Sequence, residues 1–141
     1  MNYLASDLSA SLRCGTDLVD IAHFERALDA TNGRMRSVCF TNRELRDSSG
    51  RSERLAARWA VKESVSKVLG IGLLRGIGFH DIEVTTTDEG TPSITLHGPA
   101  ERQAVKLGLT EWAVSATHEY GVAMAFVVAS RHPLPHLDSP D

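Results

Sequence analysis

The sequence has few cysteines, no long apolar run and no internal repeat. Cys14 and Cys39 are its only cysteines, and their separation fits neither a common metal site nor a disulfide framework. We therefore expect both to be reduced residues in the core of a cytoplasmic protein. No stretch approaches the roughly 20 apolar residues that span a bilayer, and the first residues lack the basic cluster and apolar run of a signal peptide. These absences argue against a secreted or membrane-embedded protein.

The composition is that of one folded domain. Of the 141 residues, 42% are hydrophobic and 23% are charged, which is typical of a soluble globular protein. The length allows one domain with a substantial core but not two of ordinary size. We expect residues 1–11 to form a flexible extension and residues 12–130 to form the single domain. Residues 131–141 contain three prolines and are expected to form a disordered tail.

The net charge of −3 conceals a basic segment. Residues 34–58 contain seven arginines against three acidic residues, so the rest of the chain is markedly acidic. A basic segment of this kind suits an acidic macromolecule or a phosphorylated ligand, although a solvated surface with mixed charges would have the same composition. The acidic overall balance and the lack of a recognition motif argue against binding to duplex nucleic acid.

Residues 52–72, SERLAARWAVKESVSKVLGIG, predict the helix around which the fold is built. At about 100° per residue, the apolar side chains cover nearly the whole circumference, which is typical of a buried helix. Ser52 is expected to cap the first turn, Glu53 to favour its positive end, and Gly70 to close the last turn in the left-handed conformation. The helix would be about four turns long and largely enclosed.

Beyond its first turn, this largely apolar helix carries four charged residues: Arg58, Lys62, Glu63 and Lys67. Glu63 is four residues from Lys67, and Arg58 is four residues from Lys62, so each pair shares a face. Solvated charges on an ordinary amphipathic helix, with Glu63 paired to Lys67, would be the ordinary explanation. A buried carboxylate beside several cations can instead hold a metal ion together with an anionic ligand. The apolar circumference favours the second interpretation.

An aspartate interrupts the first predicted strand, which covers residues 12–21. Side chains alternate along this stretch as in a strand. Asp17 follows closely after Gly15, and a glycine in a strand lets another element approach the backbone. Aspartate is depleted in strands, so Asp17 requires a specific reason. Asp20 is expected to cap a helix over residues 21–32.

The rest of the chain predicts short helices and antiparallel strands. Thr41 and Glu44 have the spacing of a capping box at the start of a short helix. The glycine-rich connector at residues 70–78 lacks the G-K-[ST] of a P-loop and could fold over a ligand. The remaining expected elements are a hairpin over residues 79–97, a helix over 98–109, and two strands over 110–118 and 121–130. We therefore expect an α+β fold in which an antiparallel sheet packs around the long, largely buried central helix.

Asp17 and Glu63 are candidates for a Mg²⁺ site. Two carboxylates from separate elements suit Mg²⁺, which takes one or two protein carboxylates, keeps several waters and binds substrate phosphates. The nearby cations would bind those phosphates, and His118, at a strand end, is a further candidate. Each residue also has an ordinary alternative: Asp17 could cap a turn, and Glu63 could pair with Lys67. His118 could simply be a satisfied strand-end histidine, so the joint occurrence of these residues is what favours a site.

Seven stretches of the sequence occur in the order in which a known family has them. They are G-T-D-L-V-D-I (15–21), F-T-x-x-E (40–44), L-A-A-R-W-A-V-K-E-S-V-S-K (55–67), G-I-G (70–72), D-I-E-V (81–84), G-T-P (90–92) and V-S-A-T-H-E (114–119). Through them the chain resembles the holo-acyl-carrier-protein synthases, the short-chain branch of the 4′-phosphopantetheinyl transferases. The resemblance covers residues 12–130 and implies the fold of that family.

The resemblance implies a site and a reaction. Asp17 and Glu63 would bind Mg²⁺, and Lys67 would meet the pyrophosphate of coenzyme A. The residues that would contact the rest of the nucleotide are Arg58, Lys62 and His118 at the phosphates, and Gly70, Gly72, Gly90 and Pro92 near the adenine nucleotide. The implied reaction transfers 4′-phosphopantetheine from coenzyme A to a serine of an apo acyl carrier protein and releases adenosine 3′,5′-bisphosphate. Family members are typically homotrimers with active sites between subunits.

Glu63, Lys67 and Asp17 are the expected catalytic residues. The attacking serine hydroxyl must lose a proton, and Glu63, directly or through a water, is the candidate base. A water held by Asp17 is the rival. Lys67 and Mg²⁺ would keep Glu63 ionised and weakly basic, which favours a route through water.

Four positions depart from the family pattern. His23 stands where many relatives have an arginine that helps to dock the carrier protein. Ile71 and Thr91 replace a small polar residue and a lysine in two glycine-containing stretches near the nucleotide, and Val19 stands where longer relatives have a second acid. The departures at His23, Ile71 and Thr91 keep open a non-catalytic module that binds coenzyme A or a carrier protein. A structural trimer with solvated charges is the plainest alternative.

Overall fold

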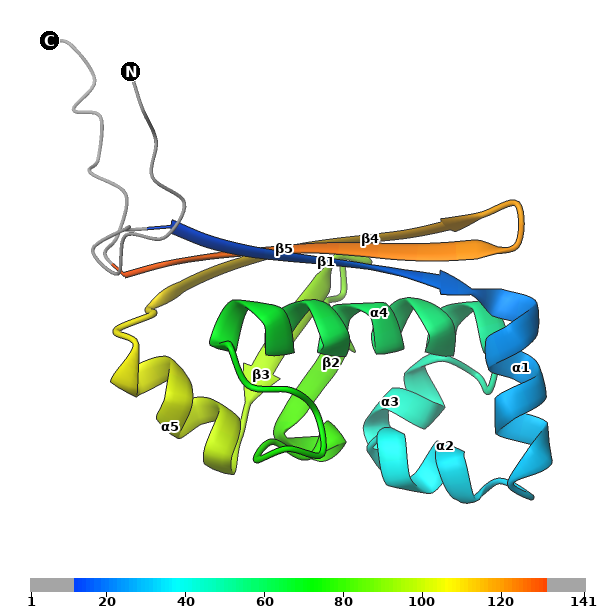
Figure 1. Ribbon diagram of the computed structural model, residues 1–141. Helices are drawn as coiled ribbons and strands as arrows, with labels where there is room; N and C mark the ends of the chain where they lie inside the picture. Colours follow the sequence, from blue (N-terminus) through cyan, green and yellow to red (C-terminus); the bar gives the residue numbers. More distant parts are fainter. Residues whose placement is uncertain (1–11, 132–141) are drawn as a thin grey trace, which may run out of the picture.

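The computed structural model describes residues 12–131 (Figure 1). Its elements are β1 (Leu12–Asp20), α1 (Ile21–Ala30), α2 (Arg34–Cys39), α3 (Asn42–Asp47), α4 (Ser52–Leu69), a short 3₁₀ helix (Phe79–Asp81), β2 (Ile82–Thr86), β3 (Pro92–Leu96), α5 (Gly98–Lys106), β4 (Glu111–Glu119) and β5 (Val122–Ser130). The expected extension at residues 1–11 and nearly all of the expected tail lie outside the described residues.

Two antiparallel sheets flank the central helix. One sheet has the strand order β1-β5-β4, and the other is the β2-β3 hairpin. Figure 1 shows α4 running along one face of the three-stranded sheet, with the hairpin beyond it, α1 to α3 at one end and α5 at the other. The expected α+β class with an antiparallel sheet around a long helix is confirmed.

The central helix α4 is enclosed by the other elements. Leu55, Val61 and Val65 are fully buried, as expected for a helix that is apolar almost all round. Gly70 ends the helix in the left-handed conformation, with φ of 71°. The helix is 18 residues long, about five turns rather than four. Among the described residues, no helix combines the length and the apolarity that crossing a bilayer requires.

The expected cap at the start of α4 is wrong by one residue. Arg51 occupies the N-cap position and makes no side-chain capping hydrogen bond. Ser52 is the first helical residue, and its hydroxyl donates to the Glu25 carboxylate of α1 over 3.1 Å. Glu53 does lie in the first turn, where its carboxylate pairs with the Arg51 guanidinium at 2.8 Å. This acidic residue favours the positive end of the helix.

Side-chain caps at α1 and α3 match the sequence predictions. The Asp20 carboxylate accepts a hydrogen bond from the His23 amide over 2.8 Å. Thr41 and Glu44 form a reciprocal capping box at the start of α3. Helix α2 was not predicted, because its N-cap is a left-handed glycine, Gly33, and it has no side-chain capping signal.

The three-stranded sheet is covered on one face only. In β1, Gly15 and Val19 are buried, whereas Leu18 is 67% exposed. Leu18 lies opposite Met124 on β5, and Phe126 follows two residues later; these are 44% and 47% exposed. The outer face of the sheet is therefore a surface with several apolar side chains open to solvent.

This one-sided cover corrects one prediction about the cysteines. Cys39 is buried, and burial raises the pKa of its thiol to about 11. Cys14 is exposed, contrary to the expectation that it belongs to the core. The reason is the alternation of β1, which turns its even-numbered side chains to the uncovered face.

Candidate functional site

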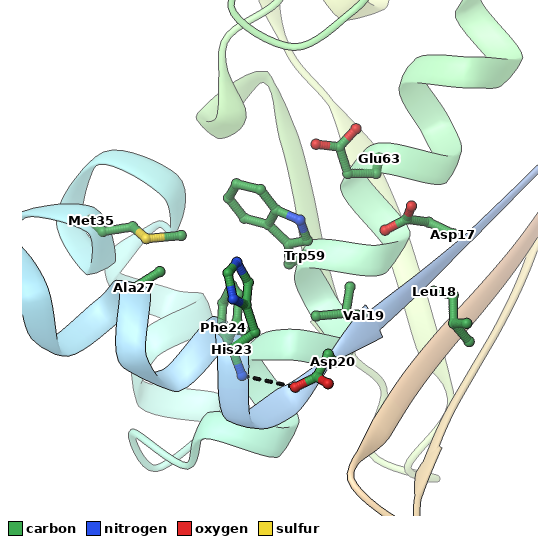
Figure 2. A pocket seen from close by; sticks show the side chains of 10 residues that line it. All are labelled: Asp17, Leu18, Val19, Asp20, His23, Phe24, Ala27, Met35, Trp59 and Glu63. Carbon is green, nitrogen blue, oxygen red and sulfur yellow. Dashed lines mark hydrogen bonds between the residues drawn. The ribbon is translucent and has the colours of Figure 1, made fainter.

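The structure brings the side chains of Asp17 and Glu63 together. Asp17 projects from β1 toward α4, and Glu63 projects from α4 beside it (Figure 2). Both line a cavity of about 400 Å³ that extends toward α1 and α2. Figure 2 shows the two carboxylates at one end of this cavity, with Trp59 between them and Met35. An early strand and the central helix thus supply the two acids of one site.

The two carboxylates are held in an environment that disfavours a second negative charge. Burial raises the pKa of Asp17 above its usual value, and the Lys67 ammonium opposes this effect without cancelling it. Burial also raises the pKa of Glu63, and the charge of Asp17 raises it further, again against Lys67. Two ionised acids in such a site repel one another, so a bound cation would stabilise the pair.

The donor set fits Mg²⁺. Carboxylate oxygens are the ligands that this ion prefers, and one or two of them are enough when a substrate phosphate completes the shell. Within residues 12–131 there is no group of three or more His, Cys, Asp or Glu side chains that could hold a metal ion. Asp17 and Glu63 are the two carboxylates of this cavity that could hold such an ion, with the other positions left to water and substrate.

Lys67 lies over the acidic pair and remains accessible. Its ammonium donates to the Thr16 carbonyl over 2.6 Å and is 3.6 Å from an Asp17 carboxylate oxygen. The alternative in which Lys67 pairs with Glu63, four residues away, is not what the structure shows, because Lys67 pairs across to β1. The Lys67 side chain is 54% exposed. The Lys67 ammonium is thus held near β1 while its side chain stays open to solvent, so it can bind an anionic ligand.

Lys62 does not belong to this site. Its ammonium is fully buried and donates to the Glu44 carboxylate at 3.0 Å and to the carbonyls of Phe79 and Ile82, both at 2.7 Å. Three acceptors satisfy its three donors. The expectation that Lys62 binds nucleotide phosphates is wrong, because a step of about 100° along the helix turns it away from the Glu63 face and toward α3 and β2.

Arg58 lies on another side of α4 from the acidic pair. Its guanidinium is buried, and one terminal nitrogen donates to the Thr86 hydroxyl over 3.2 Å. The Arg58 Nε atom is buried without a hydrogen-bond partner. Arg58 and Lys67 are nine residues apart, about two and a half turns, so they point to opposite sides of the helix. Within one chain, they cannot contact the same phosphate.

The hairpin residues lie near Arg58 rather than near the acids. Pro92 is the register partner of Thr86, to which Arg58 donates. Next to it is a second cavity of about 310 Å³, lined by residues 91–94 of the hairpin and residues 112–114 of β4. Gly90 precedes this segment in the turn, with φ of 83°. The stretch 90–92 is thus placed with Arg58.

The remaining predicted residues occupy two further positions. His118 is exposed on β4, which β5 separates from β1, and it interacts electrostatically with Glu53 at the start of α4. Gly70 and Gly72 are exposed and directly follow α4, just beyond Lys67. The single chain brings together Asp17, Glu63 and Lys67 but leaves His118 and Arg58 apart from them.

The apolar part of the cavity was missed by the sequence predictions. Phe24 and Met35 line it together with Trp59. The Trp59 ring stacks on Phe79, with ring centroids 4.8 Å apart. Its position one turn before Glu63 on α4 was the available signal, because residues four apart share a helix face. His23, singled out for carrier docking, also lines this cavity.

Comparisons with known proteins agree on one family. The model of the 4′-phosphopantetheinyl transferase superfamily matches residues 13–125. The chain is 44% identical over 116 residues to the holo-[acyl-carrier-protein] synthase of Frankia casuarinae, covering 82% of this chain and 93% of the relative. It is 38% identical over 120 residues to the synthase of Geobacter sulfurreducens, covering 83% and 95%.

A solved structure has the same arrangement of elements. The crystal structure of Helicobacter pylori holo-[acyl-carrier-protein] synthase in complex with coenzyme A aligns with a TM-score of 0.76 at 26% sequence identity. The alignment covers 83% of this chain and 99% of that one. The chain therefore belongs to the 4′-phosphopantetheinyl transferase superfamily and, within it, to the holo-[acyl-carrier-protein] synthases.

Proposed function

We propose that Asp17, Glu63 and Lys67 form the active site at which this transferase moves 4′-phosphopantetheine from coenzyme A to a serine of an apo acyl carrier protein. The observation that carries the assignment is the pair of half-buried acids beside an accessible lysine, at the end of an open cavity. The serine oxygen bonds to the phosphorus that carries pantetheine, and the pyrophosphate bond breaks. Adenosine 3′,5′-bisphosphate leaves.

Asp17 and Glu63 would hold Mg²⁺, in line with their raised pKa values and hard oxygen donors. When bound, Mg²⁺ would supply positive charge at the pyrophosphate as negative charge develops on the leaving group. Lys67 would neutralise the same charge from its position above Asp17, where the Thr16 carbonyl fixes its ammonium. Most of the catalytic effect would come from this positioning of charge.

Glu63 is the proposed general base. Burial and the Asp17 charge raise the pKa of Glu63 and so make it a stronger proton acceptor than an ordinary glutamate. Lys67 opposes this increase. The serine proton would pass to Glu63 directly or through a water, and a water held by Asp17 is the alternative acceptor. Both routes place the proton within the acidic pair.

The apolar part of the cavity would hold the pantetheine arm. Trp59, Phe24 and Met35 line it and continue from Glu63 toward α1 and α2 (Figure 2). The arm is uncharged along its length, so apolar walls suit it better than they suit the nucleotide. A ligand with its diphosphate at Lys67 would extend its arm along Trp59.

Homotrimers with active sites between subunits are the proposed assembly. Two observations support sites that two chains share. Arg58 and Lys67 point to opposite sides of α4, so one nucleotide could contact both only if they came from different copies. The outer face of the sheet is uncovered and exposes Leu18 and Phe126, which a second copy would bury. His118, Gly70, Gly72, Gly90 and Pro92 would then complete the nucleotide site.

Carrier docking would involve the basic segment, in a protein that works in the cytoplasm. Arg43 and Arg46 are exposed on α3 near the α1 and α2 end of the cavity. Charge complementarity would speed the encounter with an acidic carrier surface. His23, exposed on α1 and lining the cavity, would lie at the same docking surface.

Intact-protein mass spectrometry tests this function. Incubation of the chain with coenzyme A, Mg²⁺ and an apo carrier protein should increase the carrier mass by about 340 Da, the mass of the prosthetic group. The increase should disappear with chelator and with the carrier variant that lacks the acceptor serine. Coenzyme A binding without any mass increase, across several carriers, would instead indicate a non-catalytic binding module.

A further inference from the structure

The backbone of β1 touches the backbone of α4 at Gly15. A Cβ atom built on Gly15 would lie 2.1 Å from the Ser64 carbonyl oxygen and 3.2 Å from Lys67 Cβ. Real Cβ atoms do not approach other atoms this closely, and the nearest atom belongs to a helix backbone that cannot rotate away. Any side chain at this position would therefore push the strand and the helix apart by about 1 Å.

Space, not backbone conformation, requires the glycine. Gly15 is absent from the residues with positive φ, so other residues could adopt its strand conformation. Glycine in a strand costs about 0.5–1 kcal/mol relative to alanine. No turn or bulge at Gly15 explains this cost. The glycine is therefore needed for the close approach of the β1 backbone to the α4 backbone.

The residues on either side of this contact are those of the active site. Asp17 is two residues after Gly15, on the same face of β1. Glu63 directly precedes Ser64, and Lys67 follows one turn later on α4. The Lys67 ammonium reaches over the contact to the Thr16 carbonyl at 2.6 Å. The distance between the two backbones thus determines the distance between the acids and the position of the lysine.

The opposite side of the contact is fixed as well. The Ser64 hydroxyl donates to the Ala60 carbonyl at 2.7 Å, and it lies 3.5 Å from the carbonyl of Ala125 on β5. The Thr16 hydroxyl donates to the same Ala125 carbonyl at 2.8 Å. Strand β5 therefore contacts both segments next to Gly15, and a displacement of α4 from the sheet would lengthen the contact between Ser64 and Ala125.

We infer that Gly15 is a positioning residue, which sets the separation of Asp17 and Glu63 so that both carboxylates reach one divalent cation while Lys67 stays over them. The inference rests on the proposed metal site and adds the element that fixes its geometry. A side chain at residue 15 should move the acids apart by a distance that metal ligation does not tolerate.

The test measures Mn²⁺ binding by electron paramagnetic resonance, with coenzyme A present and no carrier protein. Gly15→Ala should weaken Mn²⁺ binding at least about 10-fold and lower kcat about 100-fold, as expected for a displacement near 1 Å. The Michaelis constant for the carrier should change little, because the basic segment is untouched. Ala104→Val, which adds volume on the buried face of α5, is the matched control and should retain Mn²⁺ binding at similar loss of stability.

A longer carboxylate provides a rescue that a purely structural role would not show. In Gly15→Ala/Asp17→Glu, the additional methylene should recover part of the Mn²⁺ binding that Gly15→Ala loses. When Gly15 is retained, Asp17→Glu alone should weaken Mn²⁺ binding. Should Gly15→Ala fail to fold, Ser64→Thr adds one methyl beside the contact, where the Ser64 side chain lies near Ala125 of β5, and should weaken binding in the same direction, by less.

The outcomes separate this inference from the proposed function. If the native chain binds Mn²⁺ and Asp17→Asn abolishes binding, but folded Gly15→Ala binds as well as the native chain, the positioning role is wrong and the metal site stands. If Asp17→Asn binds as well as the native chain, the metal site is wrong and the positioning role falls with it. Equal losses in Gly15→Ala and Ala104→Val would reduce Gly15 to an ordinary packing residue.

Discussion

Two consecutive residues of α4, Lys62 and Glu63, face opposite kinds of environment. Lys62 is fully buried, and every one of its donors has an acceptor. Glu63 is half-buried beside another acid, and its pKa is raised. The first arrangement is satisfied by the protein alone and stabilises the fold. The second remains electrostatically unfavourable until a cation arrives, which is what a binding site for cations and anions together requires.

Helix α4 therefore contributes both to the stability of the fold, through Lys62, and to the binding site, through Glu63. On the Lys62 side, Glu44 accepts from the lysine, from the Thr41 amide at 2.8 Å and from the Val84 amide at 2.7 Å. One carboxylate thereby joins α3, α4 and β2. This buried network stabilises the packing of α4 on α3 and β2, away from the Glu63 side of the helix.

The largest effect should come from the Glu63 side. Glu63→Gln should lower kcat by roughly 10²–10⁴-fold, because it removes both the base and a metal ligand. Lys67→Ala should lower it by roughly 10²–10³-fold through the loss of charge at the pyrophosphate. Both variants should keep the native circular dichroism spectrum. Turnover within a few-fold of the native enzyme in either variant would contradict the assignment of the active site.

The next largest effect should come from the Lys62 side of the helix, as a loss of unfolding free energy. Lys62→Met leaves the Glu44 carboxylate buried without its cation, which should cost roughly 3–5 kcal/mol of unfolding free energy in urea titrations. Glu44→Gln/Lys62→Met should recover part of this loss, because no charge then remains buried. Activity per folded molecule should stay within about 3-fold of the native value for Lys62→Met, since such a residue acts on the fold and not in the transition state. Normal stability with lost activity would return Lys62 to the active site.

A smaller effect is expected away from both faces, at the basic segment. Reversal of Arg46 to glutamate leaves the ion pairs of Arg43 with Asp47 and of Arg51 with Glu53 intact. It should raise the Michaelis constant for the carrier about 10-fold by weakening electrostatic steering, with the effect reduced at high salt. Reversals of Arg43 and Arg51 should act in the same direction. An equal change in the Michaelis constant for coenzyme A would show that these arginines do not dock the carrier.

The smallest effect is a pH-dependent difference in stability. The pKa of Glu63 in the folded chain lies above the ordinary 4.5, so ionisation of Glu63 opposes folding at neutral pH, and the penalty vanishes below pH 4.5. In the absence of metal, Glu63→Gln should therefore raise the unfolding free energy at pH 7, by less than about 1 kcal/mol given its exposure. At pH 4 the unfolding free energies of Glu63→Gln and the native chain should be equal. A loss of stability at pH 7 would mean that the acid is already stabilised by its surroundings.

Glu83 is the matched control with the opposite sign. The Thr41 hydroxyl donates to its carboxylate over 2.7 Å, and this bond, together with His97, lowers the pKa of Glu83 below 4.5. Its ionised form stabilises the fold above pH 4.5, and this contribution is lost as the pH falls through the lowered pKa. Glu83→Gln should thus destabilise the chain at pH 7 and have little effect under more acidic conditions, as measured by thermal unfolding.

The sequence predicts the elements of the site better than their partners. Local signals were sufficient for the Asp20 cap, the Thr41 and Glu44 capping box, and the left-handed Gly70, because each involves atoms only a few residues apart. Gly15 beside Asp17 correctly indicated a close approach to the strand. What the strand approaches, the backbone of Ser64, depends on the packing of β1 on α4.

The errors have a common physical cause. A spacing of four residues places Glu63 near Lys67 and Arg58 near Lys62, but each lysine pairs with a carboxylate on another element, Asp17 for Lys67 and Glu44 for Lys62. Long-range partners of this kind are not encoded in helical spacing. The misplacement of Cys14 is similar, because alternation defines two faces of a strand without stating which one is covered.

The two tryptophans of the chain lie at the two cavities described above, one in each. Trp59 borders the acidic pocket and stacks on Phe79, whereas Trp112 borders the pocket beside Pro92. Their fluorescence can therefore be assigned to separate places once either is replaced by phenylalanine. Emission from the Trp112→Phe variant would follow the pantetheine end of a bound ligand, and emission from Trp59→Phe would follow events at the hairpin. The molecule carries its own pair of optical probes, and no dye has to be attached.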